Sequence, residues 1–183
     1  MKGIVLYGPP ASGKSTTTAA LAELDPRFVL LRKLKAGNQR GTEYDFVDAE
    51  LLAQLRSTER LLVETHRYGN TYAIDRGQVE QLVLAGQVPI VHMGNIPDIR
   101  RLVAADPWLL VLLWVSREIC EQRSRHRGDS DTAKRLKAWD ETMEDLQTHG
   151  RDVFSLAVHT DQATPEQVAR RIADAFMNSR LPL

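Results

Sequence analysis

The residues with the clearest chemistry lie near the amino terminus. The phosphate-binding pattern G-x-x-x-x-G-K-[ST] is matched by Gly8-Pro9-Pro10-Ala11-Ser12-Gly13-Lys14-Ser15. An apolar run over residues 3–7 precedes this segment and a helical pattern over 14–24 follows it, so loop amides and a helix N-terminus can face one anion. Lys14 would contact the β and γ phosphates of a nucleoside triphosphate, and the Ser15 hydroxyl would bind Mg²⁺. We therefore predict an ATP site formed by this loop and the adjoining Thr16.

Arginines are concentrated later in the chain, around Gly128-Asp129-Ser130, at Arg117, Arg123, Arg125, Arg127 and Arg135. A transferring phosphoryl group spreads negative charge, which arginines offset once a mobile segment closes over it. The pattern favours a small-molecule kinase with a mobile Arg-rich lid; we assign Arg127 and Arg135 to catalysis with Lys14, and Arg123 to ATP binding. The N-K-x-D that a switch GTPase needs is absent from the sequence. Interleaved acidic residues leave open the alternative of a solvated helix face.

Strands and helices alternate along the sequence. Strands are expected over about 3–7, 27–31, 61–64, 88–93, 109–115 and 153–158, and helices over about 14–24, 48–56, 75–86, 98–105, 116–125, 131–148 and 164–178. Residues 32–42 are polar with two glycines and predict a loop. The uninterrupted apolar run over 109–115 is typical of a strand covered on both faces. The order predicts an α/β fold, a three-layer sandwich around a mainly parallel sheet.

Composition limits the other function classes. The 183 residues include 24 Lys and Arg against 24 Asp and Glu, and 43% are hydrophobic, which is typical of an ordinary globular domain. Zero net charge argues against a nucleic-acid polymer or a membrane surface as a partner. The single cysteine, Cys120, excludes an internal disulfide. We expect one cytoplasmic domain and predict no oligomeric state.

The sequence resembles the guanylate-kinase-like branch of the P-loop nucleoside monophosphate kinases. Besides the phosphate loop, the similar pieces are Ala36-Gly37-Asn38-Gln39-Arg40-Gly41-Thr42-Glu43-Tyr44-Asp45-Phe46-Val47, Tyr68-Gly69-Asn70-Thr71, Arg127-Gly128 and Arg135-Leu136. The resemblance implies a P-loop NTPase fold in one kinase domain over 1–183. In it, about 1–31, 73–122 and 150–183 form the core, about 32–72 a small acceptor-binding subdomain, and about 123–149 the lid and the following helix. It also implies that Arg32, Lys35, Tyr44 and Tyr68 hold the acceptor phosphate.

The acceptor side departs from the family pattern. Where the family has a Thr-Thr-Arg stretch and a second arginine, this chain has Leu30-Leu31-Arg32 and Lys35. The family reads guanine with carboxylates and a hydroxyl; Glu64 is the remaining carboxylate candidate, and Asn70 stands at the hydroxyl position. The strand over 88–93 ends in His92-Met93-Gly94 instead of the family's Asp-x-Asp. His92 either contacts the acceptor or is a half-buried histidine that donates to a carbonyl.

We expect an ATP-dependent kinase that uses Mg²⁺ and transfers the γ-phosphoryl group to a phosphorylated acceptor. The first candidate is a nucleoside monophosphate, not necessarily GMP. A sugar phosphate such as ribose 1,5-bisphosphate is the alternative, and a non-catalytic binding domain of the same fold is a second one. An acceptor phosphate is ionised near pH 7 and needs no general base. A sugar hydroxyl would need one, and His92 or Glu64 would be the first candidate.

Overall fold

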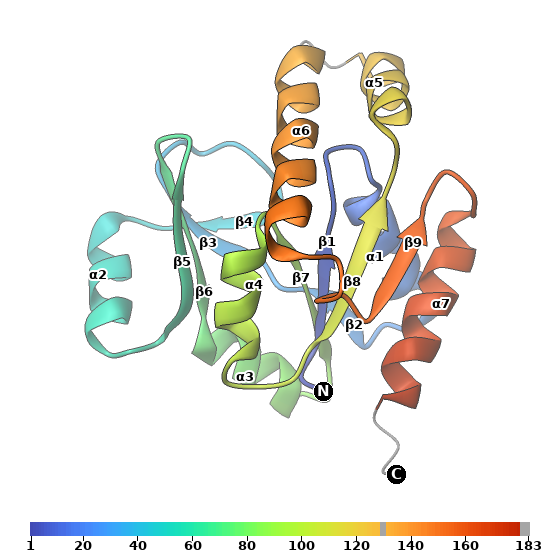
Figure 1. The fold of residues 1–183 in the computed structure, drawn as a ribbon. Coiled ribbons are helices and arrows are strands. Elements are labelled where there is room, and N and C mark those ends of the chain that lie inside the picture. The colour runs from blue at the N-terminus through green and yellow to red at the C-terminus, as the bar shows by residue number, and fades with distance from the viewer. Residues whose placement is uncertain (129–130, 180–183) are drawn as a thin grey trace.

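A five-stranded parallel sheet forms the centre of the computed structural model, which describes residues 1–128 and 131–179 (Figure 1). In spatial order its strands are β2 (Phe28–Leu30), β7 (Val88–Met93), β1 (Ile4–Tyr7), β8 (Leu109–Trp114) and β9 (Leu156–His159). The strands β1, β7 and β8 are buried along their whole length. Such strands must be apolar on both faces, which explains their uninterrupted hydrophobic runs.

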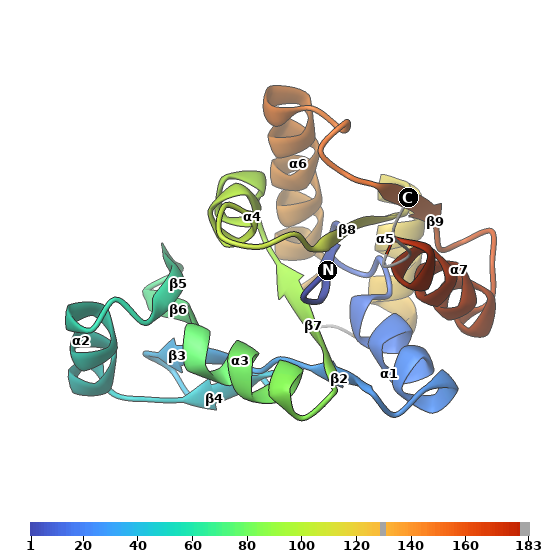
Figure 2. The same cartoon turned by 90° about the horizontal axis from the view of Figure 1, so that it is seen from below.

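Helices cover both faces of this sheet, as Figure 2 shows from below. They are α1 (Lys14–Leu24), α3 (Arg76–Leu84), α4 (Ile96–Val103), α6 (Thr132–His149) and α7 (Pro165–Asn178), whereas α5 (Arg117–His126) packs on α6. Leu21 of α1 and Ile172 of α7 pack on one face with Ile4 and Leu6. On the other face, α4 and α6 pack over Val5 and Tyr7. The predicted three-layer α/β sandwich is therefore confirmed.

A second, four-stranded sheet lies beside the first, with α2 (Ala49–Ser57) on its far side (Figure 1). Its strands, in spatial order, are β4 (Tyr44–Phe46), β3 (Lys33–Ala36), β6 (Asn70–Asp75) and β5 (Leu61–Arg67). The pairs β3–β6 and β5–β6 are antiparallel, whereas β3–β4 is parallel. Leu34 and Ala73 face α2 and form a small core with Leu52 and Leu55.

Three sequence expectations differ from the structure. The predicted loop over residues 32–42 contains β3, where Leu34 alternates with Lys33 and Lys35; such alternation is typical of a half-buried strand, but the lysines and glycines concealed it. The strands β4 and β6 were not predicted. The last strand begins at Leu156 instead of residue 153. Of the second sheet, the sequence pattern therefore predicted only part of β5 and missed β3, β4 and β6.

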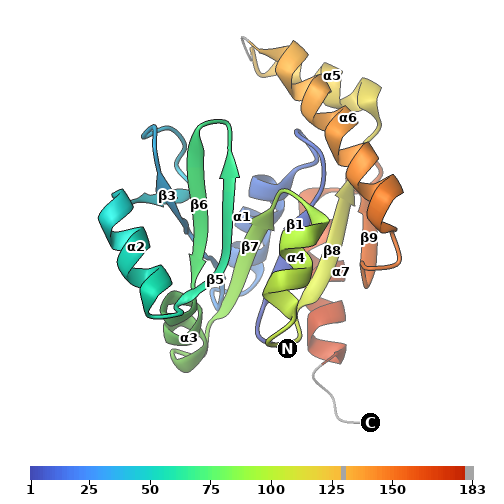
Figure 3. The same ribbon diagram turned by 60° about the vertical axis from the view of Figure 1, so that its left-hand side comes forward.

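The pair α5–α6 extends beyond the carboxyl ends of the central strands (Figure 3). Ser116 caps α5 by accepting a hydrogen bond from the Ile119 amide. Asp129 and Ser130 of the predicted lid lie outside the described residues. Across the described ranges, none of the helices is both long and apolar enough to span a membrane.

Candidate active site

The predicted phosphate loop connects β1 to α1 at the carboxyl edge of the central sheet. Close packing explains its first glycine. A Cβ atom at Gly8 would lie 2.0 Å from the carbonyl oxygen of Leu113 on β8, so no other residue fits there without moving a core strand. Ser12 is fully buried, and the Thr160 hydroxyl donates to its carbonyl over 3.0 Å. The loop is thus fixed from both β8 and the segment after β9.

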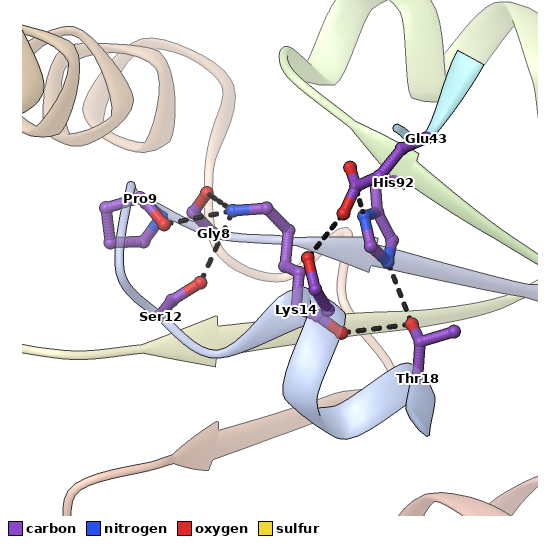
Figure 4. A network of polar contacts seen from close by, with 8 residues as sticks. Gly8, Pro9, Ser12, Lys14, Thr18, Glu43 and His92 are labelled. Atoms are coloured by element: carbon purple, nitrogen blue, oxygen red, sulfur yellow. Dashed lines mark hydrogen bonds and ion pairs between the residues drawn. The ribbon is translucent and has the colours of Figure 1, made fainter. Parts of the chain in front are cut away.

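Lys14 reaches back over this loop (Figure 4). Its Nζ donates to the carbonyl oxygens of Gly8 at 2.7 Å and Pro9 at 2.9 Å, and to the Ser12 hydroxyl at 3.4 Å. Burial is the main cause that lowers the pKa of Lys14 to about 8, and the nearby charges of Lys33 and Arg135 lower it further. Lys14 is therefore a partly desolvated cation at the centre of a basic region.

A cavity of about 800 Å³ opens beside the loop; we call it the loop cavity. Its lining includes Ala11, Arg123, Arg127 and Thr160. The Arg123 guanidinium donates to the Ala11 carbonyl at 2.9 Å and to the Thr160 carbonyl at 2.9 Å. Arg127 Nε donates to the Arg123 carbonyl at 3.4 Å. Two of the predicted arginines thus line the cavity that adjoins the loop.

The other predicted arginines divide into two kinds. Arg135 is half-buried on α6 and close enough to Lys14 to lower its pKa. Arg117 instead pairs with Asp140 at 2.9 Å, and Arg125 pairs with Glu121 at 2.5 Å along one turn of helix. Arg117 and Arg125 therefore fit the alternative of a solvated helix face, because exposed ion pairs of this kind occur on ordinary helix surfaces.

A second cavity, of about 190 Å³, lies between the smaller sheet and the central one; we call it the hairpin cavity. Side chains that line it include Lys33, Tyr44, Thr65, Tyr68, Tyr72 and Asp98. Side chains alternate between the two faces of a strand. On β5 the cavity is therefore lined by Val63, Thr65 and Arg67, while the residues between them face outward.

Lys33 is the cation of the hairpin cavity. Its Nζ lies 5.9 Å from the ring centroid of Tyr44 and 5.8 Å from that of Tyr72. Among the described residues it has no hydrogen-bond or ion-pair partner. Burial lowers the pKa of Lys33 to about 8, with opposing contributions from Glu43 and Asp98. Sequence reasoning missed Lys33, although its alternation with Leu34 was a usable signal.

Asp98 provides the opposite charge in this cavity. It is 4% exposed and accepts hydrogen bonds from Thr65, from Asn95 Nδ2 at 2.7 Å and from Arg101 at 2.9 Å. A buried carboxylate requires such donors to remain charged. The sequence placed Asp98 only at a helix start, so its role in the cavity was not predicted.

Several predicted acceptor residues do not line the hairpin cavity. Glu64 faces away on β5 and accepts from Arg56 at 2.5 Å. Arg32 pairs with Asp45 at 2.7 Å, outside the cavity. Asn70 Oδ1 accepts from the Asn38 backbone amide at 2.8 Å, so this side chain holds the backbone after β3.

Lys35 is likewise occupied: it donates to Asn38 Oδ1 at 2.9 Å and to the Arg40 carbonyl at 2.6 Å. It holds the loop before β4 and does not line the cavity.

The two predicted tyrosines line the cavity. Tyr68 and Gly69 both have positive φ and form the two-residue turn between β5 and β6, the geometry of a type I′ hairpin. The Tyr68 hydroxyl donates to Glu141 of α6 at 2.9 Å, and Arg67 pairs with the same carboxylate. The hairpin tip is therefore joined directly to α6.

His92, the next-to-last residue of β7, lies inside a polar network (Figure 4). Its Nδ1 lies 3.3 Å from Glu43 Oε2, and its Nε2 lies 2.8 Å from the Thr18 hydroxyl. The other Glu43 oxygen accepts from the Ser15 hydroxyl. Burial lowers the pKa of His92, and the hydrogen bond from His92 is the main cause that lowers the pKa of Glu43 to about 2. The prediction that His92 donates to a carbonyl is wrong, because its partner is a carboxylate.

The chain is similar to known guanylate kinases in sequence and in fold. A guanylate kinase from Bordetella pertussis is 34% identical over 87 residues, which span 45% of this chain and only 40% of the relative. A guanylate kinase from Synechocystis sp. is 31% identical over 150 residues, 73% of this chain and 74% of the relative. A guanylate kinase structure from Anaplasma phagocytophilum has a TM-score of 0.64 at 15% identity, covering 98% of this chain and 87% of its own. No family model matches the chain.

Proposed function

This chain belongs to the guanylate kinase family, and we propose that it is an ATP-dependent phosphotransferase that moves the γ-phosphoryl group to a phosphorylated small molecule. The observation that supports this most is the position of Lys14. Its Nζ is held over the phosphate loop by the Gly8 and Pro9 carbonyls, and the charges of Lys33 in the hairpin cavity and Arg135 on α6 both lower its pKa. Phosphoryl transfer needs this alignment and charge compensation more than covalent chemistry.

On the donor side, we assign ATP to the loop cavity and to the loop over residues 8–16. Lys14 would hold the transferring group, Arg123 would fix the loop against the nucleotide, and Arg127 with Arg135 would offset the charge that develops. The Ser15 hydroxyl lies against a carboxylate, an all-oxygen environment that fits Mg²⁺. When bound, Mg²⁺ neutralises charge on the β and γ phosphates.

On the acceptor side, we assign the acceptor to the hairpin cavity. Lys33 would hold its phosphate, with hydroxyls from Tyr44 and Tyr68 nearby. Thr65 and Asp98, which lie on another wall, would accept from amino or hydroxyl groups of the remaining part. A nucleoside monophosphate presents both kinds of group, which makes it the first candidate.

A sugar phosphate is the second candidate, and the orientation of Glu64 away from the cavity supports it. The carboxylate expected to read guanine is turned out of the cavity and held by Arg56, while β7 ends in His92 without an acidic residue. Both changes remove groups that the resemblance associates with guanine.

A panel of nucleoside monophosphates and sugar phosphates, assayed for ADP release from ATP, tests the proposal. We expect ADP release with one class of acceptor and little with GMP. No release with any acceptor, together with no ATP binding by calorimetry, would contradict the proposal and favour a non-catalytic binding domain.

A further inference from the structure

Glu43 is the residue at which the two sides of the site meet. It belongs to the segment just before β4, whose Tyr44 lines the hairpin cavity. One of its oxygens accepts from the Ser15 hydroxyl, at the start of α1, and the other lies 3.3 Å from His92 Nδ1 on β7. Three elements far apart in the sequence therefore converge on one carboxylate (Figure 4).

The direction of the hydrogen bond between His92 and Glu43 follows from the chemistry of the carboxylate. An ionised carboxylate only accepts, so His92 Nδ1 must carry a proton. On the other side of the ring, Nε2 lies 2.8 Å from the Thr18 hydroxyl, which also donates to the Lys14 carbonyl at 3.0 Å. His92 is 8% exposed, so packing limits its orientation. The imidazole is therefore held from α1 and presents one donor to Glu43.

The negative charge of Glu43 beside the Ser15 hydroxyl is suited to binding a cation. At the carboxyl end of β7, where an acidic residue could support a cation bound at Ser15, the chain has His92-Met93-Gly94. Glu43, which lies against His92, brings a carboxylate to the Ser15 hydroxyl. Mg²⁺ prefers oxygen ligands, and ligating carboxylates are commonly oriented by a hydrogen-bonded neighbour.

We propose that Glu43 is the acidic residue of the Mg²⁺ site, acting with Ser15, and that His92 is the positioning residue that orients it. This inference rests on the proposed function, because it assumes that Mg²⁺ enters with ATP. The inference also couples metal binding to acceptor binding. Glu43 directly precedes Tyr44, so the same short segment would contact Mg²⁺ through Glu43 and the acceptor through Tyr44.

Binding of Mn²⁺ in the presence of ATP, measured by electron paramagnetic resonance, tests the role of Glu43. We expect Glu43→Gln, which keeps the shape and removes the charge, to weaken Mn²⁺ binding by about 10-fold or more. Glu43→Asp keeps the charge and should restore part of the affinity. Glu50→Gln, which removes an exposed carboxylate on α2, is the matched control and should bind Mn²⁺ like the wild type. Equal Mn²⁺ affinity in Glu43→Gln and wild type would overturn the inference.

Two substitutions test the positioning role of His92. His92→Asn retains a donor close to the position of Nδ1 and should keep Mn²⁺ affinity within about 3-fold, whereas His92→Leu should weaken it by about 10-fold. ATP binding in EDTA should be the same in both variants. If both variants lose Mn²⁺ affinity equally, or if His92→Leu loses none, the positioning role is wrong.

ATP binding by the wild type in EDTA separates this inference from the proposed function. If the wild type binds no ATP with or without metal, the proposed function fails and the inference fails with it. If the wild type binds ATP and Mn²⁺ normally and Glu43→Gln does the same, only the inference fails.

Discussion

Replacing Lys33 by methionine should make the protein more stable and a poorer enzyme. The Lys33 ammonium has no hydrogen-bond or ion-pair partner among the described residues, and burial lowers its pKa from 10.5 to about 8. A fall of that size corresponds to at most about 3–4 kcal/mol of destabilisation while the group is charged. The side chain keeps some contact with solvent, so we expect Lys33→Met to raise the free energy of unfolding by about 1–2 kcal/mol at pH 7.

The pH dependence of this gain has a definite sign. Below pH 8, Lys33 is charged in both the folded and the unfolded protein, and the folded state bears the full penalty. Between pH 8 and 10.5 the unfolded chain binds the proton more tightly, so the wild type gains stability as the pH rises. The advantage of Lys33→Met should therefore shrink over this window.

The same variant should bind the acceptor less tightly. A hydrogen bond to a charged group contributes about 1.5–3 kcal/mol, so the acceptor KM should rise about 10- to 100-fold with ATP binding unchanged. Urea unfolding at pH 7 and pH 10, together with steady-state kinetics, measures both effects. Lys137→Met, at an exposed position on α6, is the control. A less stable Lys33→Met protein, or an unchanged acceptor KM, would refute the reasoning.

Three further variants test the assigned roles. Lys14→Ala should lower turnover at least about 100-fold with the fold intact by circular dichroism, and full activity would remove Lys14 from the site. Arg127→Ala should lower kcat by about 10-fold or more in steady-state assays while changing the acceptor KM little; a change confined to KM would contradict a catalytic role. Glu64→Gln should leave the acceptor KM within about 2-fold, because Arg56 holds this carboxylate outside the hairpin cavity; a large increase would show that Glu64 reads the acceptor.

The residues that we propose for the donor side follow from a local sequence pattern, whereas those that we propose for the acceptor side do not. The loop over residues 8–15 is a local pattern whose shape follows from its own glycines and from the flanking strand and helix. In the hairpin cavity, the useful residues depend on which face of a short strand each side chain occupies. Lys33 and Thr65 were passed over for Arg32 and Glu64, their immediate neighbours on the opposite face.

Glu43 shows a second limit of sequence reasoning. Its contact with Ser15 joins residues 28 positions apart, and its contact with His92 depends on how two sheets are placed. No periodicity encodes that placement. The segment from Ala36 to Val47 carries part of the family resemblance, but that resemblance did not single out Glu43, which contacts Ser15.

The two-residue turn at Tyr68-Gly69 also suggests a route by which acceptor preference could be redesigned. Inserting one residue into β5 ahead of this turn would shift the strand by one position and reverse its faces. Glu64 and His66 would then enter the cavity, and Thr65 and Arg67 would leave it. A one-residue insertion in this hairpin would therefore bring a carboxylate into the cavity, where it could accept hydrogen bonds from a nucleotide base.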